Sequence, residues 1–218
     1  MRKQFDIVVY PTKEIEPPIE DDALGWFASK NINDALPKTS AEWIIIAHQE
    51  VKITKTLLDQ IAKACLDFPA VDCFTPSEES QQPLSYVAAP SPYLMVVTRR
   101  IIQRTGAFDL ELGLGSRFLD LGLRMYHAGG QTFAIPLSSV SLKKDLPSEK
   151  MLLMNPRDVV QVLYKNLGIA VAFSYLIKHP KVIFYFLKNF RACHQKRKKA
   201  ISLSKVSDER LQELYKAF

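Results

Sequence analysis

Short runs of apolar residues alternate with stretches of helical periodicity along the first two thirds of this chain. Apolar runs of this length predict strands that are buried on both faces, as in parallel sheets. They lie at Phe5–Tyr10, Trp43–Ala47, Ala70–Phe74, Tyr93–Val97 and Thr132–Ile135. The stretches predicted as helices lie at Trp26–Leu36, Lys55–Phe68, Arg99–Thr105 and Ser116–His127. This alternation predicts an α/β fold with a mostly parallel central sheet.

Glycine, serine and proline mark the predicted ends of these elements. Gly106 is expected as the C′ residue of the helix that ends at Thr105, and Gly129 is expected to end the last helix of this region. Ser116 is expected to cap the start of that last helix. The four prolines of residues 76–92 predict a long loop.

The chain changes character after residue 150. Residues 155–187 are helical in pattern and strongly apolar, and the cations and proline of residues 178–181 split them into two runs. Neither run reaches the ~20 apolar residues that a membrane-spanning helix needs. We therefore divide the chain into a body, residues 1–150, and a helical, basic extension, residues 151–218.

The net charge of +6 is concentrated in this extension. Eight lysines or arginines and no acidic residue lie between Lys178 and Lys199, so the rest of the chain is close to neutral. Next to these cations, one helical face would collect Val182, Ile183, Phe186, Leu187 and Phe190. The pattern predicts an interfacial helix on an anionic membrane surface. The alternative is a helix that packs on the body and keeps its basic end in solvent.

Cysteine count and charge distribution also bear on location and partners. Cys65, Cys73 and Cys193 lack the spacing of a metal site and cannot all pair, which fits buried thiols in a reducing cytoplasm. The basic segment comes without an aromatic reading surface, so no nucleic-acid partner is expected. We expect a cytoplasmic protein that lies peripherally at the inner face of the membrane.

The clearest candidate chemistry follows the strand Trp43–Ala47. His48, Gln49 and Glu50 come directly after it, and ligands of α/β sheets bind beyond the carboxyl ends of the strands. In extended backbone, positions i and i+2 project to the same side, so His48 and Glu50 are candidates to face a pocket together and to bind Mn²⁺. The alternative is that His48 is a polar cap on the strand and Glu50 begins a surface turn.

The segment from Thr105 to Pro136 resembles the acceptor-side signature of GT-A glycosyltransferases of the family-2 type. The positions that match are Gly106, Phe108, Asp109, Asp120, Leu121, Arg124, Ala128, Gly129 and Pro136. The strand and triplet WIIIAHQE resemble the strand that carries the DxD motif, most closely in a subgroup with HQD at that place. Asn31 is similar to an asparagine on the helix that precedes this strand.

This resemblance implies a GT-A-like sandwich that transfers a sugar, with inversion, from a nucleotide-sugar to a glycan acceptor such as a cell-surface polysaccharide or a glycolipid. It implies that His48, Gln49, Glu50 and Asn31 bind the nucleotide-sugar and its diphosphate. It also implies a divalent cation, Mg²⁺ or Mn²⁺, which neutralises the leaving diphosphate and for which His48 and Glu50 are the candidate ligands.

The chain departs from the family pattern where the chemistry is done. Arg117 and Phe118 replace the acidic pair that supplies the catalytic base, which leaves Glu111 as the candidate base. A metal-linked histidine of the family is replaced by Leu142, and only 47 residues precede His48, which predicts an abbreviated nucleotide-binding half.

Asp120 is interpreted as structural, paired with Arg117 and Arg124 on its own helix. Two functions stay open: an active glycosyltransferase, or an inactive GT-A-like domain that binds a glycan, a nucleotide or a partner enzyme at the membrane.

Overall fold

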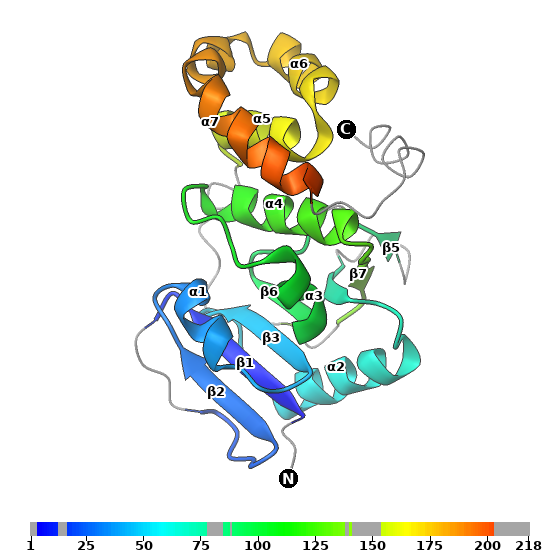
Figure 1. The fold of residues 1–218 in the computed structure, drawn as a ribbon. Helices are drawn as coiled ribbons and strands as arrows, with labels where there is room; N and C mark the ends of the chain where they lie inside the picture. The colour runs from blue at the N-terminus through cyan, green and yellow to red at the C-terminus, as the bar shows by residue number, and fades with distance from the viewer. Residues whose placement is uncertain are drawn as a thin grey trace.

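A computed structural model describes residues 4–12, 17–77, 85–87, 89–137, 140 and 154–202 of the chain. Its body is a sheet with helices on both faces, and a layer of further helices lies at the end of the molecule away from β1 and β2 (Figure 1). Leu142, the position of the family's metal-linked histidine, lies outside the described residues.

The sheet has seven strands in the order β2-β1-β3-β6-β4-β7-β5. The strands are β1 (Phe5–Tyr10), β2 (Leu24–Ala28), β3 (Trp43–His48), β4 (Cys73–Pro76), β5 (Ser85–Tyr86), β6 (Leu94–Thr98) and β7 (Thr132–Ile135). Five of them point the same way, and β5 and β6 run opposite to their neighbours. The predicted α/β fold with a mostly parallel sheet is confirmed.

Helices cover both faces of this sheet. On one face, α2 (Lys55–Asp67) packs Leu57, Leu58 and Ile61 against the inner residues of β1, β3 and β6. The other face is covered by α1 (Ile32–Ala35), the short 3₁₀ helix η1 (Leu36–Lys38), α3 (Arg99–Thr105) and α4 (Leu114–His127). Gly106 ends α3 with a φ of 78°, a conformation that favours glycine, as the sequence predicted.

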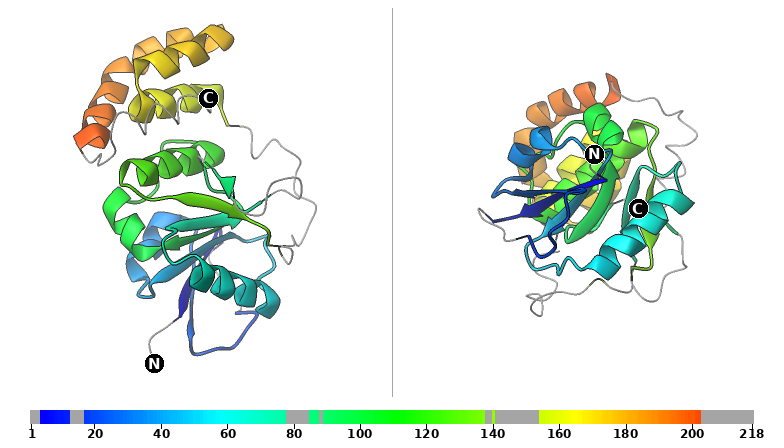
Figure 2. Two further views of the ribbon diagram at one scale, coloured as in Figure 1. Left: turned by 90° about the vertical axis from the view of Figure 1, so that its right-hand side faces the viewer. Right: turned by 90° about the horizontal axis from the view of Figure 1, so that it is seen from below.

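The predicted helical extension packs on the outer side of α4 (Figure 2). It consists of α5 (Pro156–Leu167), α6 (Ile169–Lys178), a 3₁₀ turn η2 (Pro180–Val182) and α7 (Ile183–Ser202). Leu119 and Leu123 of α4 contact Val159 and Leu163 of α5 within one apolar cluster. Because its inner side faces the sheet cluster, α4 is buried on two sides.

Three local predictions need correction. Of the helix predicted over Trp26–Leu36, the first three residues belong to β2, because Leu24–Ala28 pairs in parallel with Phe5–Val9. Only the four residues Ile32–Ala35, after the cap Asn31, are α-helical. The helix α4 begins at Leu114 after Gly113, so Ser116 lies buried inside it and is not its cap. The loop predicted over residues 76–92 contains the short strand β5, while residues 78–84 and 88 lie outside the described part.

Candidate functional site

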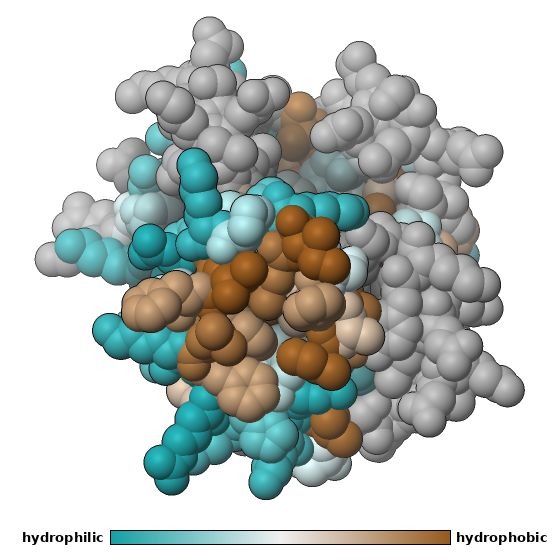
Figure 3. All heavy atoms as spheres, turned by 90° about the horizontal axis from the view of Figure 1, so that it is seen from above, coloured by the Kyte–Doolittle hydropathy of each residue, from teal (hydrophilic) through white to brown (hydrophobic). Residues whose placement is uncertain are grey.

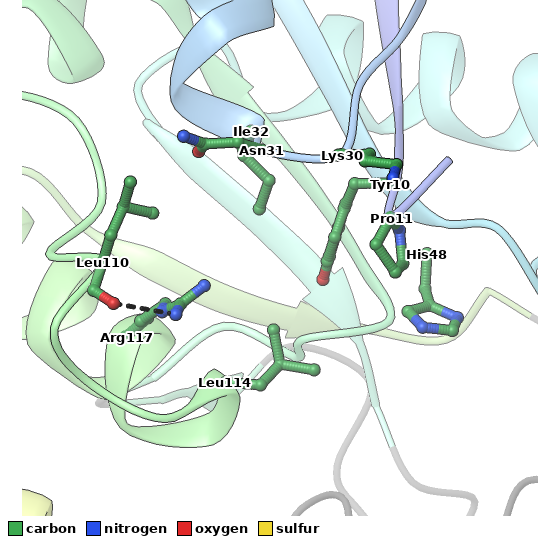
Figure 4. Close-up of a pocket in the computed structure, with 9 residues that line it drawn as sticks. All are labelled: Tyr10, Pro11, Lys30, Asn31, Ile32, His48, Leu110, Leu114 and Arg117. Atoms are coloured by element: carbon green, nitrogen blue, oxygen red, sulfur yellow. Dashed lines mark hydrogen bonds between the residues drawn. The ribbon is translucent and has the colours of Figure 1, made fainter. Parts of the chain in front are cut away.

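A cavity of about 390 Å³ opens where three parallel strands end (Figure 4). We call it the strand-end cavity. Tyr10 closes β1, His48 closes β3, and Lys30–Ile32 follow β2. The full lining is Tyr10, Pro11, Lys30, Asn31, Ile32, His48, Leu110, Leu114 and Arg117. Figure 4 shows Leu110 and Arg117 on one side of the cavity, opposite Lys30, Tyr10 and His48.

Asn31 is placed in this cavity by its role as a helix cap. Its side-chain oxygen accepts from the backbone N–H of Asn33 at 3.0 Å, which starts α1. The Asn33 side chain in turn makes two hydrogen bonds to the backbone of Phe108, at 2.8 and 2.9 Å. These bonds connect α1 to the loop that carries Leu110, another residue of the cavity lining.

His48 forms part of the cavity wall and is 3% exposed. Its Nδ1 accepts from the backbone N–H of Glu50 at 3.3 Å, and its ring meets Tyr10 and Tyr93 edge-on. Burial lowers the pKa of His48, against a smaller opposite effect of Glu50, so the imidazole is neutral near pH 7. Its buried Nε2 has no hydrogen-bond partner among the described residues, so one polar atom of the wall is unsatisfied by them.

The residues around this cavity do not fit a divalent metal ion. The described residues contain no group of three or more His, Cys, Asp or Glu side chains arranged for a metal. Lys30 and Arg117 line the cavity, and its lining includes no carboxylate. Gln49 and Glu50, predicted with His48 as donor or metal residues, are not among the lining residues. Hard cations prefer carboxylate oxygens, so this lining suits an anion better than a metal.

Arg117 and Phe118 take up two different positions at the start of α4. Phe118 is 1% exposed and packs between Tyr10 and Phe108, with ring centroids 6.3 and 4.9 Å apart. It therefore belongs to the core and leaves the cavity open. Arg117 is half-buried and donates to the carbonyls of Leu112 and Leu110, at 2.5 and 2.9 Å. The predicted ion pair of Arg117 with Asp120 is wrong, because the guanidinium folds back on this loop.

Glu111, the candidate base, lies in a second cavity of about 540 Å³, which we call the loop cavity. Leu110 lines both cavities and separates them. Glu111 accepts from Lys196 of α7 at 2.5 Å, and the same Nζ lies 3.1 Å from Asp109. Burial would raise the pKa of Asp109, but the hydrogen bond from Lys196 and the charges of Lys165 and Lys196 hold it below its usual range.

Asp120 and Arg124 form a buried ion network that also includes α5. Arg124 donates to Asp120 at 2.8 Å, and its other nitrogens donate to the carbonyls of Thr105 and Ala107. Lys165 and Asn166 reach the same carboxylate at 2.8 and 2.9 Å. The network joins the loop after α3, the helix α4 and the extension.

Comparison with solved structures shows that this protein has a GT-A glycosyltransferase fold. It is similar to a mannosyltransferase from Pyrobaculum calidifontis solved with GDP-Man and Mn²⁺, at 11% identity and a TM-score of 0.53, over 100% of this chain and 80% of that chain. It is also similar to GalNAc-T7, solved with UDP, GalNAc and Mn²⁺, at 10% identity and a TM-score of 0.52. That match covers 91% of this chain and 55% of that chain, so this chain spans about half of that structure. No protein-family model and no curated protein matches the sequence.

The sequence pattern indicated the edge of the sheet at which the cavity lies but not most of the cavity lining. It singled out His48 and Asn31, which the structure brings together. It missed Tyr10 and Lys30, and it treated Arg117 as a replacement for the family's base and as a partner of Asp120, not as a residue of the cavity. Tyr10 carried a readable signal, because it is a polar residue at the carboxyl end of a predicted parallel strand.

Proposed function

We propose that this protein is glycosyltransferase-like and binds a nucleotide-sugar donor in the strand-end cavity. The observation that supports this best is a cavity at the carboxyl ends of β1 and β3, in a GT-A fold, lined by Lys30, Asn31, His48 and Arg117. Lysine and arginine bind phosphate oxygens through charge-assisted hydrogen bonds, so they would neutralise the diphosphate without a metal. The Nε2 of His48, which has no partner among the described residues, would form a hydrogen bond with the bound ligand.

We further propose that the bound sugar is transferred to an acceptor hydroxyl of a cell-surface polysaccharide or a glycolipid. The acceptor oxygen would form a bond to the anomeric carbon as the bond to the diphosphate breaks, and the hydroxyl proton would pass to Glu111. Glu111 must first leave Lys196 and pass the wall that Leu110 forms. The reaction would take place at the cytoplasmic side of the membrane, with the protein held there through residues 178–199.

The alternative is a GT-A domain that binds its ligand, a glycan or a partner enzyme without catalysis. The burial of Phe118 at the place of the family's base favours it. The two proposals share the cavity and differ in the role of Glu111, so binding and transfer need separate tests.

Donor binding is tested by thermal unfolding with GDP and UDP, each with Mn²⁺ and with EDTA. A ligand at a hundredfold excess over its Kd should raise the Tm by about 5–10 °C, because it stabilises only the native state. Lys30→Met and Arg117→Met should remove the shift, while the matched exposed controls Lys38→Met and Arg104→Met should keep it. If neither nucleotide raises the Tm, the proposal that the strand-end cavity binds a nucleotide-sugar donor is wrong.

The same experiment separates the two ways of holding a diphosphate. A shift that persists in EDTA and in Glu50→Ala supports neutralisation by Lys30 and Arg117. A shift that EDTA abolishes, and that Glu50→Ala also removes, would restore the metal site that the sequence resemblance implies.

Transfer is tested with Glu111→Gln and radiolabelled donor. If Glu111 is the base, the substitution should lower the transfer rate by about 10²–10⁴-fold and leave the nucleotide-induced Tm shift unchanged. Asp59→Asn, a change at an exposed carboxylate on α2, is the control. An unchanged rate in Glu111→Gln would remove this residue from the mechanism, and binding without any transfer would favour the inactive domain.

A further inference from the structure

The helices α6 and α7 expose an apolar surface at the end of the molecule away from β1 and β2. On α6, Ile169, Phe173 and Ile177 recur every four residues and are 56%, 60% and 66% exposed. On α7, Ile183, Phe184 and Leu187 are exposed as well, Phe184 to 79%. We call these six residues the hairpin face. Figure 3 views this end of the molecule and shows a brown and tan area with teal residues around much of it.

This exposure does not come from helices that fail to pack. The opposite side of α6 buries Ala172 and Leu176, and the start of the η2–α7 segment buries Val182 and Phe186, all against Val160 and Tyr164 of α5. Each helix therefore has a second apolar face beyond the one that the fold uses. Apolar patches of this kind on a soluble domain mark interaction surfaces.

The charged side chains of the segment that carries the hairpin face are all of one sign. Lys178, Lys188 and Arg191 are exposed on the same two helices and Lys181 on the η2 turn between them, and the sequence has no acidic residue from 159 to 207. Other cations of this segment are already engaged: Lys196 with Asp109 and Glu111, and Arg197 with backbone carbonyls at the end of α5. The face thus combines exposed apolar side chains with exposed cations, on a segment that has no carboxylate of its own.

The bend between the helices lets both present this face at one surface. No single described helix is long and apolar enough to cross a bilayer; α6 and the segment Pro180–Ser202 meet that criterion of length and composition only together, and they are bent by 119°. Helices that carry an apolar face and a basic rim bind in the interfacial plane of anionic bilayers.

We propose that the hairpin face docks on an anionic phospholipid bilayer, with Phe173 and Phe184 inserted among the acyl chains and Lys178, Lys181 and Lys188 at the headgroups. This surface differs from the single-helix face predicted from sequence, because Val182 and Phe186 are buried and α6 contributes half of the contact. The proposal does not depend on nucleotide binding.

Flotation of the full chain with vesicles tests it, using phosphatidylcholine with and without phosphatidylglycerol. The protein should float with the anionic vesicles. The double variant Phe173→Gln/Phe184→Gln should lower the partition coefficient by about tenfold or more, because both rings leave the acyl region. Lys181→Glu/Lys188→Glu should lower it by a similar factor, since each lysine near the surface adds to the attraction.

Matched changes on α2 serve as controls, because Leu66 is 80% exposed and Lys63 is also at the surface. Leu66→Gln and Lys63→Glu should bind vesicles as the unchanged chain does. The proposal is overturned if the wild-type protein floats with neither kind of vesicle, or if the phenylalanine variant has the same partition coefficient as the wild type. So does a lipid-free dimer that the phenylalanine variant converts to a monomer, which would make the face a contact between two copies. The nucleotide-induced Tm shift is read on the same variants and should not change.

Discussion

Asp120 is a fully buried carboxylate whose charge is compensated from two helices. The pair with Arg124 is local and was predictable, because positions four apart face each other on a helix. The contacts with Lys165 and Asn166 cross 45 and 46 residues of sequence, and no pattern in the chain indicated them. Local spacing thus predicted that Asp120 is structural, but it did not predict the partner helix that makes its burial tolerable.

Asp120→Asn should lower the free energy of unfolding by roughly 3 kcal/mol, because it leaves buried cations without their counter-charge. Urea unfolding measures this. Asp59→Asn, at an exposed position of α2, should change stability by less than about 0.5 kcal/mol. Equal effects of the two substitutions would show that the Asp120 network adds nothing to stability.

The same network predicts how stability depends on pH. Burial opposes ionisation of Asp120, but Arg124 and Lys165 outweigh it and lower its pKa; the pKa of Asp109 is lowered as well. A carboxyl with a lowered folded-state pKa stabilises the protein fully above its unfolded pKa of about 4, and this contribution is lost as pH falls through the folded-state value. The urea midpoint should therefore fall from neutral pH to about pH 3, and Asp120→Asn should flatten that fall. A parallel profile for this variant would contradict the assignment.

At the scale of elements, apolar runs predicted the positions of most strands well, but they predicted poorly which strands pair with each other. The strands β1, β3, β6 and β7 lie within one residue of their predicted positions. The prediction of a helix from Trp26 was wrong at its start because Leu24–Ala28 pairs with the edge of β1. Strand pairing overrides a local helical pattern there. The periodicity of apolar residues also does not indicate the direction of a strand. The antiparallel position of β6 between β3 and β4 was therefore not predictable.

Gly168 shows how one residue sets the turn between α5 and α6. Its φ is 103°, and a Cβ there would meet Nη2 of Arg197 at 2.9 Å. The same guanidinium donates to the carbonyl of Tyr164 at 2.8 Å and lies over that ring, so it cannot simply withdraw. Gly168→Ala should therefore cost about 2 kcal/mol or more by urea unfolding. Gly129 has a φ of 80° and open space around it, so Gly129→Ala should cost only about 1 kcal/mol. Equal costs would rule out the clash with Arg197.

On the scale of the whole molecule, the cavities depend on segments that only the complete fold brings together. The strand-end cavity collects residues from β1, β3, the turn before α1 and the start of α4. The loop cavity is closed by α5 and α7 through Lys165 and Lys196. The sequence located one edge of this site because strand ends are recognisable, and it missed the cations because their proximity arises from tertiary packing.

The two-sided burial of α4 predicts that the body and the extension unfold together. Phe118 and Leu121 face the sheet, while Leu119 and Leu123 face Leu163 and its neighbours on α5, so neither part keeps a complete core without the other. Trp26 and Trp43 report on the sheet by fluorescence, and far-UV circular dichroism reports mainly on the helices. The two signals should give one coincident urea transition.

Leu163→Ala should shift both transitions equally, by about 2–5 kcal/mol, because the leucine is 2% exposed and its removal leaves a cavity. Leu66→Ala, at an 80% exposed position, should shift neither. If Leu163→Ala moved the dichroism transition and left tryptophan fluorescence in place, residues 1–150 and 151–218 would be independent folding units, and α4 would not couple the strand-end cavity to the helices that carry the hairpin face.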